Sequence, residues 1–255
     1  MVDTHTHLYF PEFNEDISQI MNLAGKEGVK HFILPNVDEA SLPVMKDFHD
    51  RFPDITSMAI GLHPTEVNDD WERVLRSFEE EFAKEKYVAI GEVGIDLYWD
   101  KSMINAQKEV FEHQLRFAQE TGVPVIIHSR DALEETLEVI EKVMPTVPLI
   151  FHSFTGNPGN VERIRQVCDP YFGINGVVTY KNAPELREAL NTIGLNKILL
   201  ETDSPYLSPV PKRGKRNDSS NLKFIRDKIS EVIGILPEEV ENTTDNNVSS
   251  IFKNA

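Results

Sequence analysis

Six apolar runs in this sequence each lead into residues that commonly bind metal ions or transfer protons. These residues are Asp3–His7, His63, Glu92, His128, His152 and Asp203. Runs rich in valine, isoleucine and leucine are typical of buried strands. In a parallel barrel the C-terminal ends of all strands open onto one face, so side chains far apart in the sequence meet there. The spacing therefore predicts one site, assembled from several strands.

His5 and His7 form a His-x-His pair at the end of the first expected strand. Residues i and i+2 of a strand face the same side, so both imidazoles can point into the barrel mouth and reach one cation at ~2.0–2.1 Å. Asp3 lies lower on the same strand, where we expect it to orient an imidazole. Such a pair is weak evidence by itself, and its position at a strand end is what makes it a candidate metal site.

Two carboxylates belong to the same candidate site. Glu92 is flanked by Gly91 and Gly94, and glycines let other groups approach a strand closely. A carboxylate in the interior of a barrel must be paired or must bind a metal. Asp203 closes the last expected strand at the mouth, and Glu201 lies one layer deeper.

The three remaining histidines serve as an internal comparison. His31 opens a strand, at the wrong end of a barrel, and His49 and His113 lie within expected helices. We predict that these three are surface or packing residues. Five of the eight histidines therefore fall at strand C-termini, which make up a small part of the chain.

Other residues near the expected mouth are candidates for substrate contacts. His63 precedes Pro64, which favours an extended backbone, and we expect it to face substrate rather than metal. Arg130 shares one side of its strand with His128. The basic segment Lys212–Arg216, with Lys212 and Arg213 at its start, is either a solvated loop or a phosphate-binding element. Its place beside the mouth of an acidic protein favours phosphate.

The elements that must position these residues alternate between strands and amphipathic helices. Expected strands cover 2–7, 31–35, 57–62, 87–91, 123–128, 149–152, 171–174 and 197–202. Expected helices cover 17–27, 39–51, 71–85, 106–120, 132–143, 161–168, 184–193, 222–233 and 237–252. This order predicts an α/β protein with one domain over 1–255, a (β/α)₈ barrel followed by extra C-terminal helices. An open doubly wound sheet is the alternative, but it requires a glycine-rich turn where this chain has His-x-His.

Composition narrows the function further. The chain has 255 residues and a net charge of −16, which argues against a protein that coats nucleic acid. It does not exclude an enzyme whose positive charge is local. The single cysteine, Cys168, rules out an intrachain disulfide and fits a reducing cytoplasm. The sequence shows no apolar stretch long enough for a membrane span and no signal peptide, so we expect no membrane partner.

Several motifs together resemble the TatD family of metal-dependent deoxyribonucleases, a branch of the amidohydrolase-like barrels. The motifs follow the family's order and extend from the start of the chain to beyond Asn217. They are Asp3-Thr4-His5-Thr6-His7-Leu8, Gly61-Leu62-His63-Pro64, Gly91-Glu92-Val93-Gly94-Ile95-Asp96, His128-Ser129-Arg130, His152-Ser153-Phe154-Thr155-Gly156 and Glu201-Thr202-Asp203-Ser204-Pro205-Tyr206. The basic segment departs from the pattern of close relatives, reading Pro211-Lys212-Arg213-Gly214 and later Asn217-Asp218-Ser219. This departure bears on substrate preference and leaves the metal ligands intact.

The resemblance implies a distorted TIM barrel that holds two or three divalent metal ions. One ion would be bound by His5, His7, Glu92 and Asp203. Glu92, His128 and His152 would hold another, so that Glu92 bridges the two ions. The family activity is the 3′-to-5′ removal of nucleotides from DNA, in some cases from RNA, and some members cleave at abasic sites.

We therefore expect a hydrolase that cleaves phosphodiester bonds of DNA through a metal-bound hydroxide, with Glu92 and Asp203 as the catalytic residues and Asp203 as general base. The ligand types favour Zn²⁺, Mn²⁺ or Fe²⁺ over Mg²⁺, whereas the family is usually described with Mg²⁺. The expected partner is nucleic acid, with single-stranded DNA ends preferred, and the oligomeric state stays open. Tyr98 and Tyr206 are candidates either for stacking a base or for packing alone. The alternative is an amidohydrolase or esterase that uses the same metal site on a small molecule or on aminoacyl-tRNA.

Overall fold

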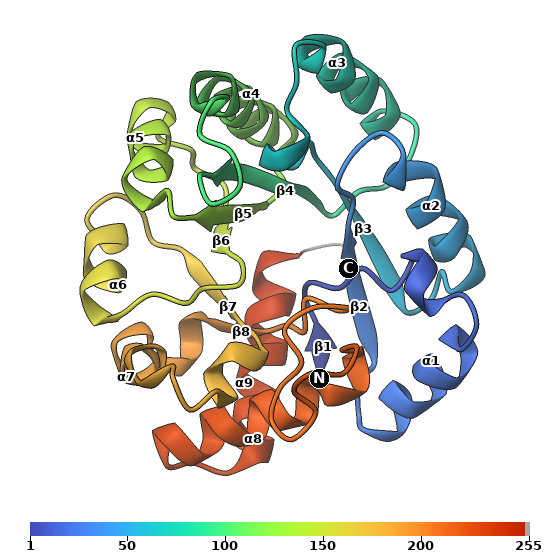
Figure 1. Cartoon of the computed structure of the whole chain (residues 1–255), viewed down its shortest axis with the longest axis vertical. Helices are drawn as coiled ribbons and strands as arrows, with labels where there is room; N and C mark the ends of the chain where they lie inside the picture. The colour runs from blue at the N-terminus through green and yellow to red at the C-terminus, as the bar shows by residue number, and fades with distance from the viewer. Residues whose placement is uncertain (253–255) are drawn as a thin grey trace.

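Eight parallel strands follow one another in chain order around a barrel in the computed structural model of the protein (Figure 1). The strands are β1 (Val2–Asp3), β2 (His31–Pro35), β3 (Thr56–Ile60), β4 (Ala89–Asp96), β5 (Val125–Arg130), β6 (Leu149–Phe151), β7 (Tyr171–Ile174) and β8 (Ile198–Leu200). The structure describes residues 1–252, and the last three residues of the expected domain 1–255 lie outside this range. The predicted (β/α)₈ barrel is confirmed.

Seven helices alternate with the strands and surround the barrel, and two more follow β8. They are α1 (Ile17–Lys26), α2 (Ser41–Arg51), α3 (Trp71–Phe82), α4 (Ile104–Thr121), α5 (Leu133–Val143), α6 (Pro158–Arg165), α7 (Pro184–Ile193), α8 (Leu222–Ile233) and α9 (Pro237–Ile251). Local sequence explains several of their ends. Pro184 and Pro237 occupy first-turn positions, where a missing N–H costs nothing. Gly122 ends α4 with a φ of 73°, which glycine adopts without strain.

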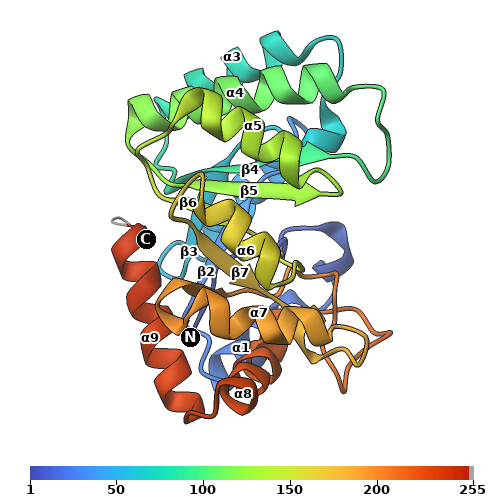
Figure 2. The same cartoon turned by 90° about the vertical axis from the view of Figure 1, so that its left-hand side faces the viewer.

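Apolar side chains fill the half of the barrel interior that lies away from the strand C-termini. In Figure 2, α9 lies across the end of the barrel opposite those C-termini. Its residues pack with interior side chains from several strands, in one buried cluster of Val2, Ile33, Ala59, Val88, Ala89, Ile126, Ile150, Leu199, Val248, Ile251 and Phe252. The barrel interior is therefore a packed core, with the candidate site residues at its C-terminal end, as expected for this architecture.

Backbone hydrogen bonds join the residues just after β1 to β8 and to the segment that follows it, and so nearly close the barrel. Thr4 N donates to Leu200 O at 3.0 Å, and Asp203 N donates to His5 O at 2.9 Å. Asp3 fastens the same seam, because its carboxylate accepts hydrogen bonds from Thr202 N at 2.9 Å and Thr202 Oγ1 at 2.6 Å. The backbone hydrogen bonds and the Asp3 carboxylate therefore hold the ends of β1 and β8 side by side.

The expected role of Asp3 as a partner of an imidazole is therefore wrong. Besides Thr202, its carboxylate accepts a hydrogen bond from Ser219 Oγ at 2.6 Å. All the hydrogen-bond partners recorded for Asp3 within residues 1–252 are hydroxyl or amide groups. A fully buried carboxylate needs such donors, and the seam supplies them.

Three of the differences between the expected and the observed strands concern the candidate site. β1 ends at Asp3 and β8 at Leu200, so His5, His7 and Asp203 lie in the segments just past the strand ends. β4 instead continues past Glu92 to Asp96. The pairing of β4 with β5 shifts register between Ile90 and Val93. Bulges of this kind re-aim a side chain, and here the irregularity falls at Glu92.

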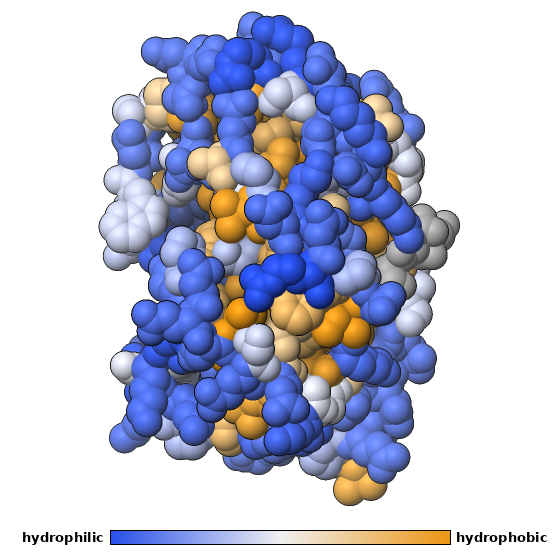
Figure 3. Space-filling view, turned by 90° about the vertical axis from the view of Figure 1, so that its right-hand side faces the viewer, coloured by the Kyte–Doolittle hydropathy of each residue, from blue (hydrophilic) through white to orange (hydrophobic). Residues whose placement is uncertain are grey.

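Hydrophilic residues cover most of the outer surface over α1, α2 and α3, with apolar side chains in the seams between helices (Figure 3). None of the helices within residues 1–252 combines the length and the apolar character needed to cross a lipid bilayer.

Candidate metal centre

The carboxylate of Glu92 lies at the centre of a cluster of buried imidazoles, and its two oxygens face different groups. Glu92 Oε2 is 3.2 Å from His5 Nε2 and 3.9 Å from His7 Nε2. Asp203 lies on the same side, with its Oδ1 at 3.9 Å from His5 Nε2 and 3.7 Å from His7 Nε2. The His-x-His pair and both carboxylates thus converge on one point, as their placement at strand ends predicts.

The other oxygen of Glu92 faces three further histidines. Glu92 Oε1 is 2.7 Å from His128 Nδ1 and 2.8 Å from His152 Nε2. His63 Nε2 is 3.4 Å from the same oxygen. His63 therefore lies within the cluster, although the sequence led us to expect it to face substrate.

Tyr9 fixes the protonation of His7. The hydroxyl of Tyr9 donates its hydrogen to Pro35 O at 2.5 Å, so it can only accept from His7 Nδ1, which lies 3.1 Å away. The proton of neutral His7 is then on Nδ1, and its Nε2 presents a lone pair to the site. That Nε2 lies 3.2 Å from His5 Nε2. Two ring nitrogens so close, one of them carrying only a lone pair, form a position suited to a cation.

Asp96 plays the corresponding part for His128. Its Oδ2 lies 2.9 Å from His128 Nε2, which leaves His128 Nδ1 directed at Glu92. Its Oδ1 accepts hydrogen bonds from Tyr98 N at 2.9 Å and Trp99 N at 3.3 Å. Carboxylates that orient a metal-binding histidine in this way are common. We gave Asp96 no role from the sequence, although its even spacing from Glu92 along one strand was an available signal.

A second layer lies beneath the cluster. Glu201 Oε1 accepts a hydrogen bond from Ser153 N at 2.6 Å and is 3.4 Å from His152 Nδ1. The rings of His5 and His152 stack at 3.8 Å between centroids. Gly173 in β7 leaves the room for Glu201, because a Cβ there would lie 2.0 Å from Glu201 Oε2. Within residues 1–252, that Oε2 has no hydrogen-bond partner.

Burial sets the charge of His5, His7 and, without a metal ion, Asp203. It lowers the pKa of His5 to about 4 and that of His7 to about 3, so both are neutral at pH 7 and can bind a cation through a lone pair. Burial also raises the pKa of Asp203 to about 8. A cation beside Asp203 would favour its ionised form again.

Glu92 behaves differently from Asp203 although it is as deeply buried. Burial by itself works against its negative charge, but the attraction of His152, His63 and His5 and the hydrogen bond from His128 outweigh that effect and lower the pKa of Glu92 well below its ordinary value. A permanently ionised carboxylate surrounded by imidazoles is a strong ligand for a divalent ion.

The donor set fits metal ions. Three groups within residues 1–252 bring one ligand atom from each of three side chains within 4.8 Å of one another. The groups are His5, His7 and Glu92; His63, Glu92 and His128; and His5, His152 and Glu201. Imidazole nitrogens and carboxylate oxygens suit Zn²⁺, Mn²⁺ and related ions. Glu92 thus belongs to two of these three groups of potential ligands, and so does His5.

A family model described as TatD related DNase matches residues 2–253. The chain belongs to the TatD family. Membership together with the buried donor set identifies it as a metal-dependent hydrolase, and the resemblance seen in the sequence motifs is confirmed.

Relatives of this TatD-family chain align with nearly its whole length. It is 35% identical over 254 residues to YabD of Bacillus subtilis (strain 168), covering 99% of each chain. It is 29% identical over 256 residues to YcfH of Escherichia coli (strain K12), covering 99% of this chain and 95% of the relative. Both relatives are named as uncharacterized metal-dependent hydrolases. The crystal structure of YJJV, a TatD homologue from Escherichia coli K12, superposes with a TM-score of 0.92 at 25% identity, covering 100% of this chain and 98% of that one.

The cationic residues that we expected to contact substrate differ in the partners that they already have within the protein. The Arg130 guanidinium lies over the Tyr98 ring at 3.8 Å, and Arg213 lies over the Tyr180 ring at 4.4 Å. Arg216 is ion-paired with Asp16 at 2.5 Å. Arg216, which we expected to bind phosphate, therefore anchors the basic segment to Asp16. Arg130, Lys212 and Arg213 form no ion pair with residues 1–252 and remain open to substrate.

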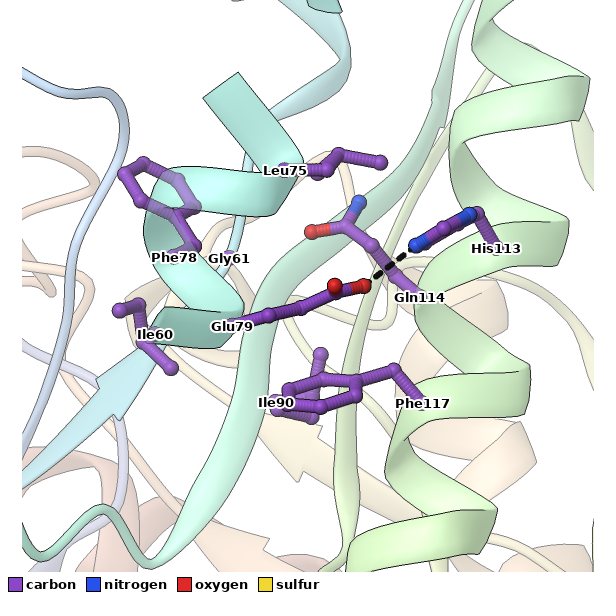
Figure 4. Close-up of a pocket in the computed structure, with 9 residues that line it drawn as sticks. All are labelled: Ile60, Gly61, Leu75, Phe78, Glu79, Ile90, His113, Gln114 and Phe117. Atoms are coloured by element: carbon purple, nitrogen blue, oxygen red, sulfur yellow. Dashed lines mark hydrogen bonds and ion pairs between the residues drawn. The ribbon is translucent and has the colours of Figure 1, made fainter. Parts of the chain in front are cut away.

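The histidines outside the TatD-family site have the ordinary partners that we expected. His31 Nε2 is 2.9 Å from Ser57 Oγ, and His49 Nδ1 is 2.7 Å from Thr56 Oγ1. Figure 4 shows the third, His113, in a small crevice between α3 and α4 with mostly apolar walls, where its Nε2 is 2.5 Å from Glu79. This carboxylate–histidine pair resembles those of the metal centre in chemistry but stands alone.

Proposed function

We propose that this TatD-family protein hydrolyses phosphodiester bonds at the ends of DNA and uses two divalent metal ions. The division of the donors by Glu92 carries the proposal, because Oε2 faces His5 and His7 while Oε1 faces His128 and His152. A carboxylate that serves two neighbouring groups is what a two-ion site needs. Such sites are well suited to phosphodiester hydrolysis.

The proposed ligands follow from this division. His5, His7, Glu92 and Asp203 would hold one ion, and Glu92, His128 and His152 the other. His63 lies close enough to the second group to adjust its coordination. Ions bound here would polarise the attacked phosphate and lower the pKa of water toward ~7. Zn²⁺, Mn²⁺ and Mg²⁺ are the candidates, and a third ion has a further donor group at His5, His152 and Glu201.

The protein's own residues have distinct tasks in this proposal. Glu92 keeps its negative charge and holds the two donor groups together. Asp203 is the general base: it lies at the mouth with its carboxylate 3.7 Å from His7 Nε2, where it can accept a proton from the attacking water. Arg130, Lys212 and Arg213 would bind phosphates next to the scissile bond, because a guanidinium presents two parallel donors to phosphate oxygens.

The preference for DNA ends rests on charge. The protein has a net charge of −16, which repels a long duplex laid across its surface. A single-stranded or frayed end can reach the mouth, where unpaired cations lie. The one cysteine is a free thiol, which is consistent with our further proposal that the protein acts in the cytoplasm.

End-labelled oligonucleotides test this function directly. Metal-loaded protein is incubated with single-stranded DNA, blunt duplex DNA and RNA of the same sequence, and products are resolved over time. We expect stepwise shortening from the 3′ end, fastest on single-stranded DNA, abolished by a chelator and restored by Mn²⁺, Mg²⁺ or Zn²⁺. A protein that cleaves none of these but hydrolyses a small ester or amide is instead the alternative, an amidohydrolase or esterase. Full activity after elemental analysis shows no bound metal would end the metal-dependent proposal.

A further inference from the structure

Two large aromatic side chains stand exposed at the mouth of the barrel. Tyr98 is 53% exposed and Trp99 is 71% exposed. They lie in the segment between β4 and α4, which projects beyond the strand ends on one side of the mouth (Figure 2). The segment after β8, with the basic residues, projects on the other side. Aromatic side chains are enriched where proteins bind ligands and partners, so two adjacent exposed rings beside the candidate site are a candidate binding surface.

The aromatic segment is tied to the metal centre by a single side chain. Asp96 Oδ1 accepts hydrogen bonds from the backbone N–H groups of Tyr98 and Trp99, and Asp96 Oδ2 lies 2.9 Å from His128 Nε2. The two aromatic residues are therefore held at a fixed place relative to His128, because both hydrogen bonds involve backbone atoms. Side chains that position a substrate need to be held in place by hydrogen bonds of this kind.

Tyr98 and Trp99 differ in how much of each ring is free to contact a ligand. The Arg130 guanidinium covers the Tyr98 ring at 3.8 Å and lies 5.6 Å from the Trp99 centroid. The two aromatic rings meet edge to face at 4.9 Å. One face of Tyr98 is therefore occupied by Arg130, whereas Trp99 keeps most of its surface free. Arg130 forms no ion pair with residues 1–252, so its N–H donors are available to a phosphate.

We propose that Trp99 is a stacking platform for an unpaired nucleobase next to the scissile phosphodiester, with Tyr98 holding Arg130 in place to bind the adjoining phosphate. This inference rests on the proposed nuclease function and adds to it the part of the substrate that selects single strands. A base can stack on Trp99 only when it has left its duplex partner. Stacking tolerates any base, because every base has a flat aromatic face.

The proposal explains how an acidic protein could hold a nucleic-acid end. Phosphate contacts alone would compete with the charge of −16, while stacking does not depend on charge. By substitution to alanine, one stacked base typically accounts for roughly a tenfold change in affinity. A nucleotide with its base on Trp99 would bring a phosphate close to Arg130.

Kinetics on matched substrates test the platform. Wild type, Trp99→Ala and Trp99→Phe are compared on a single-stranded oligodeoxynucleotide and on the same strand with abasic tetrahydrofuran residues at both ends. We expect Trp99→Ala to lower kcat/KM roughly tenfold on the intact strand and to leave the abasic strand unchanged, with Trp99→Phe close to wild type. Leu236→Ala, at a side chain 70% exposed between α8 and α9, is the control for loss of an exposed apolar group.

An equal loss on both substrates would overturn the proposal, because it would mean that Trp99 acts on the metal centre through Asp96. No loss on either substrate would overturn it as well. If wild type cleaves no oligonucleotide at all, the nuclease function fails, and a second measurement then decides the platform separately.

The second measurement uses fluorescence. The chain has two tryptophans, so Trp71→Phe leaves Trp99 as the only one. Stopped-flow mixing of this metal-loaded variant with short thymidine oligonucleotides should give saturable quenching before any turnover, and the fully abasic backbone should give none. Equal quenching by both strands, or none by either, would overturn the stacking platform whatever the cleavage assay shows.

Discussion

His7 and Tyr9 share a hydrogen bond of 3.1 Å that decides which ring nitrogen of His7 faces the metal centre. The hydroxyl is committed as a donor to Pro35 O, so it holds the proton of His7 on Nδ1. The ligand atom Nε2 is thereby kept free of a proton, at neutral pH and before any ion arrives.

Tyr9→Phe should weaken metal binding without unfolding the protein. The variant loses the acceptor for His7 Nδ1–H, so the imidazole can rotate or change tautomer. Loss of a partner of this kind typically lowers metal affinity 10–100-fold. Competition with a chromophoric chelator measures the affinity, and Tyr87→Phe, at another buried tyrosine, is the control. Equal affinities in wild type and Tyr9→Phe would show that His7 needs no orienting partner.

Glu92→Gln should abolish hydrolysis and reduce the bound metal, because the amide removes the charge that two donor groups share. The fold should survive, since a cluster of this kind is built for function rather than stability. Glu79→Gln is a matched control, because Glu79 also contacts a histidine, His113 at 2.5 Å, far from the site. Turnover and metal content are measured for both. If Glu92→Gln keeps more than about a tenth of wild-type turnover, a difference of only ~1.4 kcal/mol, Glu92 does not bridge two ions.

The metal-free protein should lose stability as pH rises above neutrality. Burial raises the pKa of Asp3 to about 7 and that of Asp203 to about 8, from an ordinary value of 3.8. Folding therefore favours their protonated forms, and this contribution is lost progressively as pH rises from the ordinary value of 3.8 to about 7 for Asp3 and to about 8 for Asp203. The pKa values of His128 and His152 are also raised, because nearby carboxylates outweigh the opposing effect of burial, and they act in the same direction.

Thermal unfolding in a chelator checks this prediction. Tm should fall between about pH 6.5 and about pH 8, because the opposing contribution of His5 and His7, whose pKa values are lowered from 6.5, is already complete at pH 6.5. Asp203→Asn should show a smaller fall, because it removes one of the titrating groups, and excess Mn²⁺ should reduce the fall in wild type by favouring the ionised carboxylate. The same variant should retain more metal than Glu92→Gln and yet be as inactive, if Asp203 is the general base. A Tm that rises steadily to about pH 9 in the chelator would contradict the prediction.

Neutralising the open cations of the basic segment should weaken binding of single strands and flatten its salt dependence. The change is Lys212, Arg213 and Lys215 to serine, with Arg216 kept because it anchors the segment to Asp16. Each phosphate contact contributes ~0.7 to the slope of log affinity against log salt, so losing three should reduce the slope by roughly 2.

The control for this variant carries the same change in net charge elsewhere. Lys26, Arg76 and Lys84 are exposed residues on or just after α1 and α3, and they are also replaced by serine. Fluorescence anisotropy over a range of salt compares the two. An equal slope in both variants would make the basic segment an ordinary solvated loop, and the small-molecule alternative would then move ahead.

Gly173→Ala should damage the lower layer of the metal centre. The new Cβ would lie 2.0 Å from Glu201 Oε2, so the carboxylate must move away from Ser153 and His152. We expect a lower Tm and weaker metal binding together. Gly25→Ala is the matched control, because nothing lies within 4 Å of a Cβ there and Gly25 is inside α1. That variant should be more stable by ~0.5–1 kcal/mol. A Gly173→Ala protein that keeps the metal affinity of wild type would remove Glu201 from the support of the site.

The sequence predicts the site well where one local rule is enough. An apolar run followed by His, Glu or Asp predicts a strand end, and this rule brings Glu92, His128, His152 and Asp203 to one site, although β4 and β5 continue past Glu92 and His128. It also places His5 and His7 on one side, although they lie just past the end of β1.

The prediction fails where a partner comes from elsewhere in the chain. Asp3 lies two residues from His5, so an imidazole partner looked reasonable. Its actual partner Thr202 is 199 residues away in the sequence, and no local pattern indicates that contact. The ion pair of Arg216 was missed for the same reason, because its partner Asp16 is 200 residues away in the sequence. Asp96 was missed for a different reason: the expected strand ended at residue 91, whereas β4 continues to Asp96 and so carries Asp96 and Glu92 together.

The seam between β1 and the segment after β8 bears on the order of events during synthesis. His5 is synthesised long before its backbone partner Asp203, whose N–H donates to His5 O at 2.9 Å in the folded protein. A nascent chain that has not yet released β8 holds several imidazoles and no complete set of donors. Metal ions can therefore bind the full site only once the barrel has closed, so they would lock a finished fold rather than begin one. Truncated chains from interrupted translation would accordingly be released without a complete set of metal ligands.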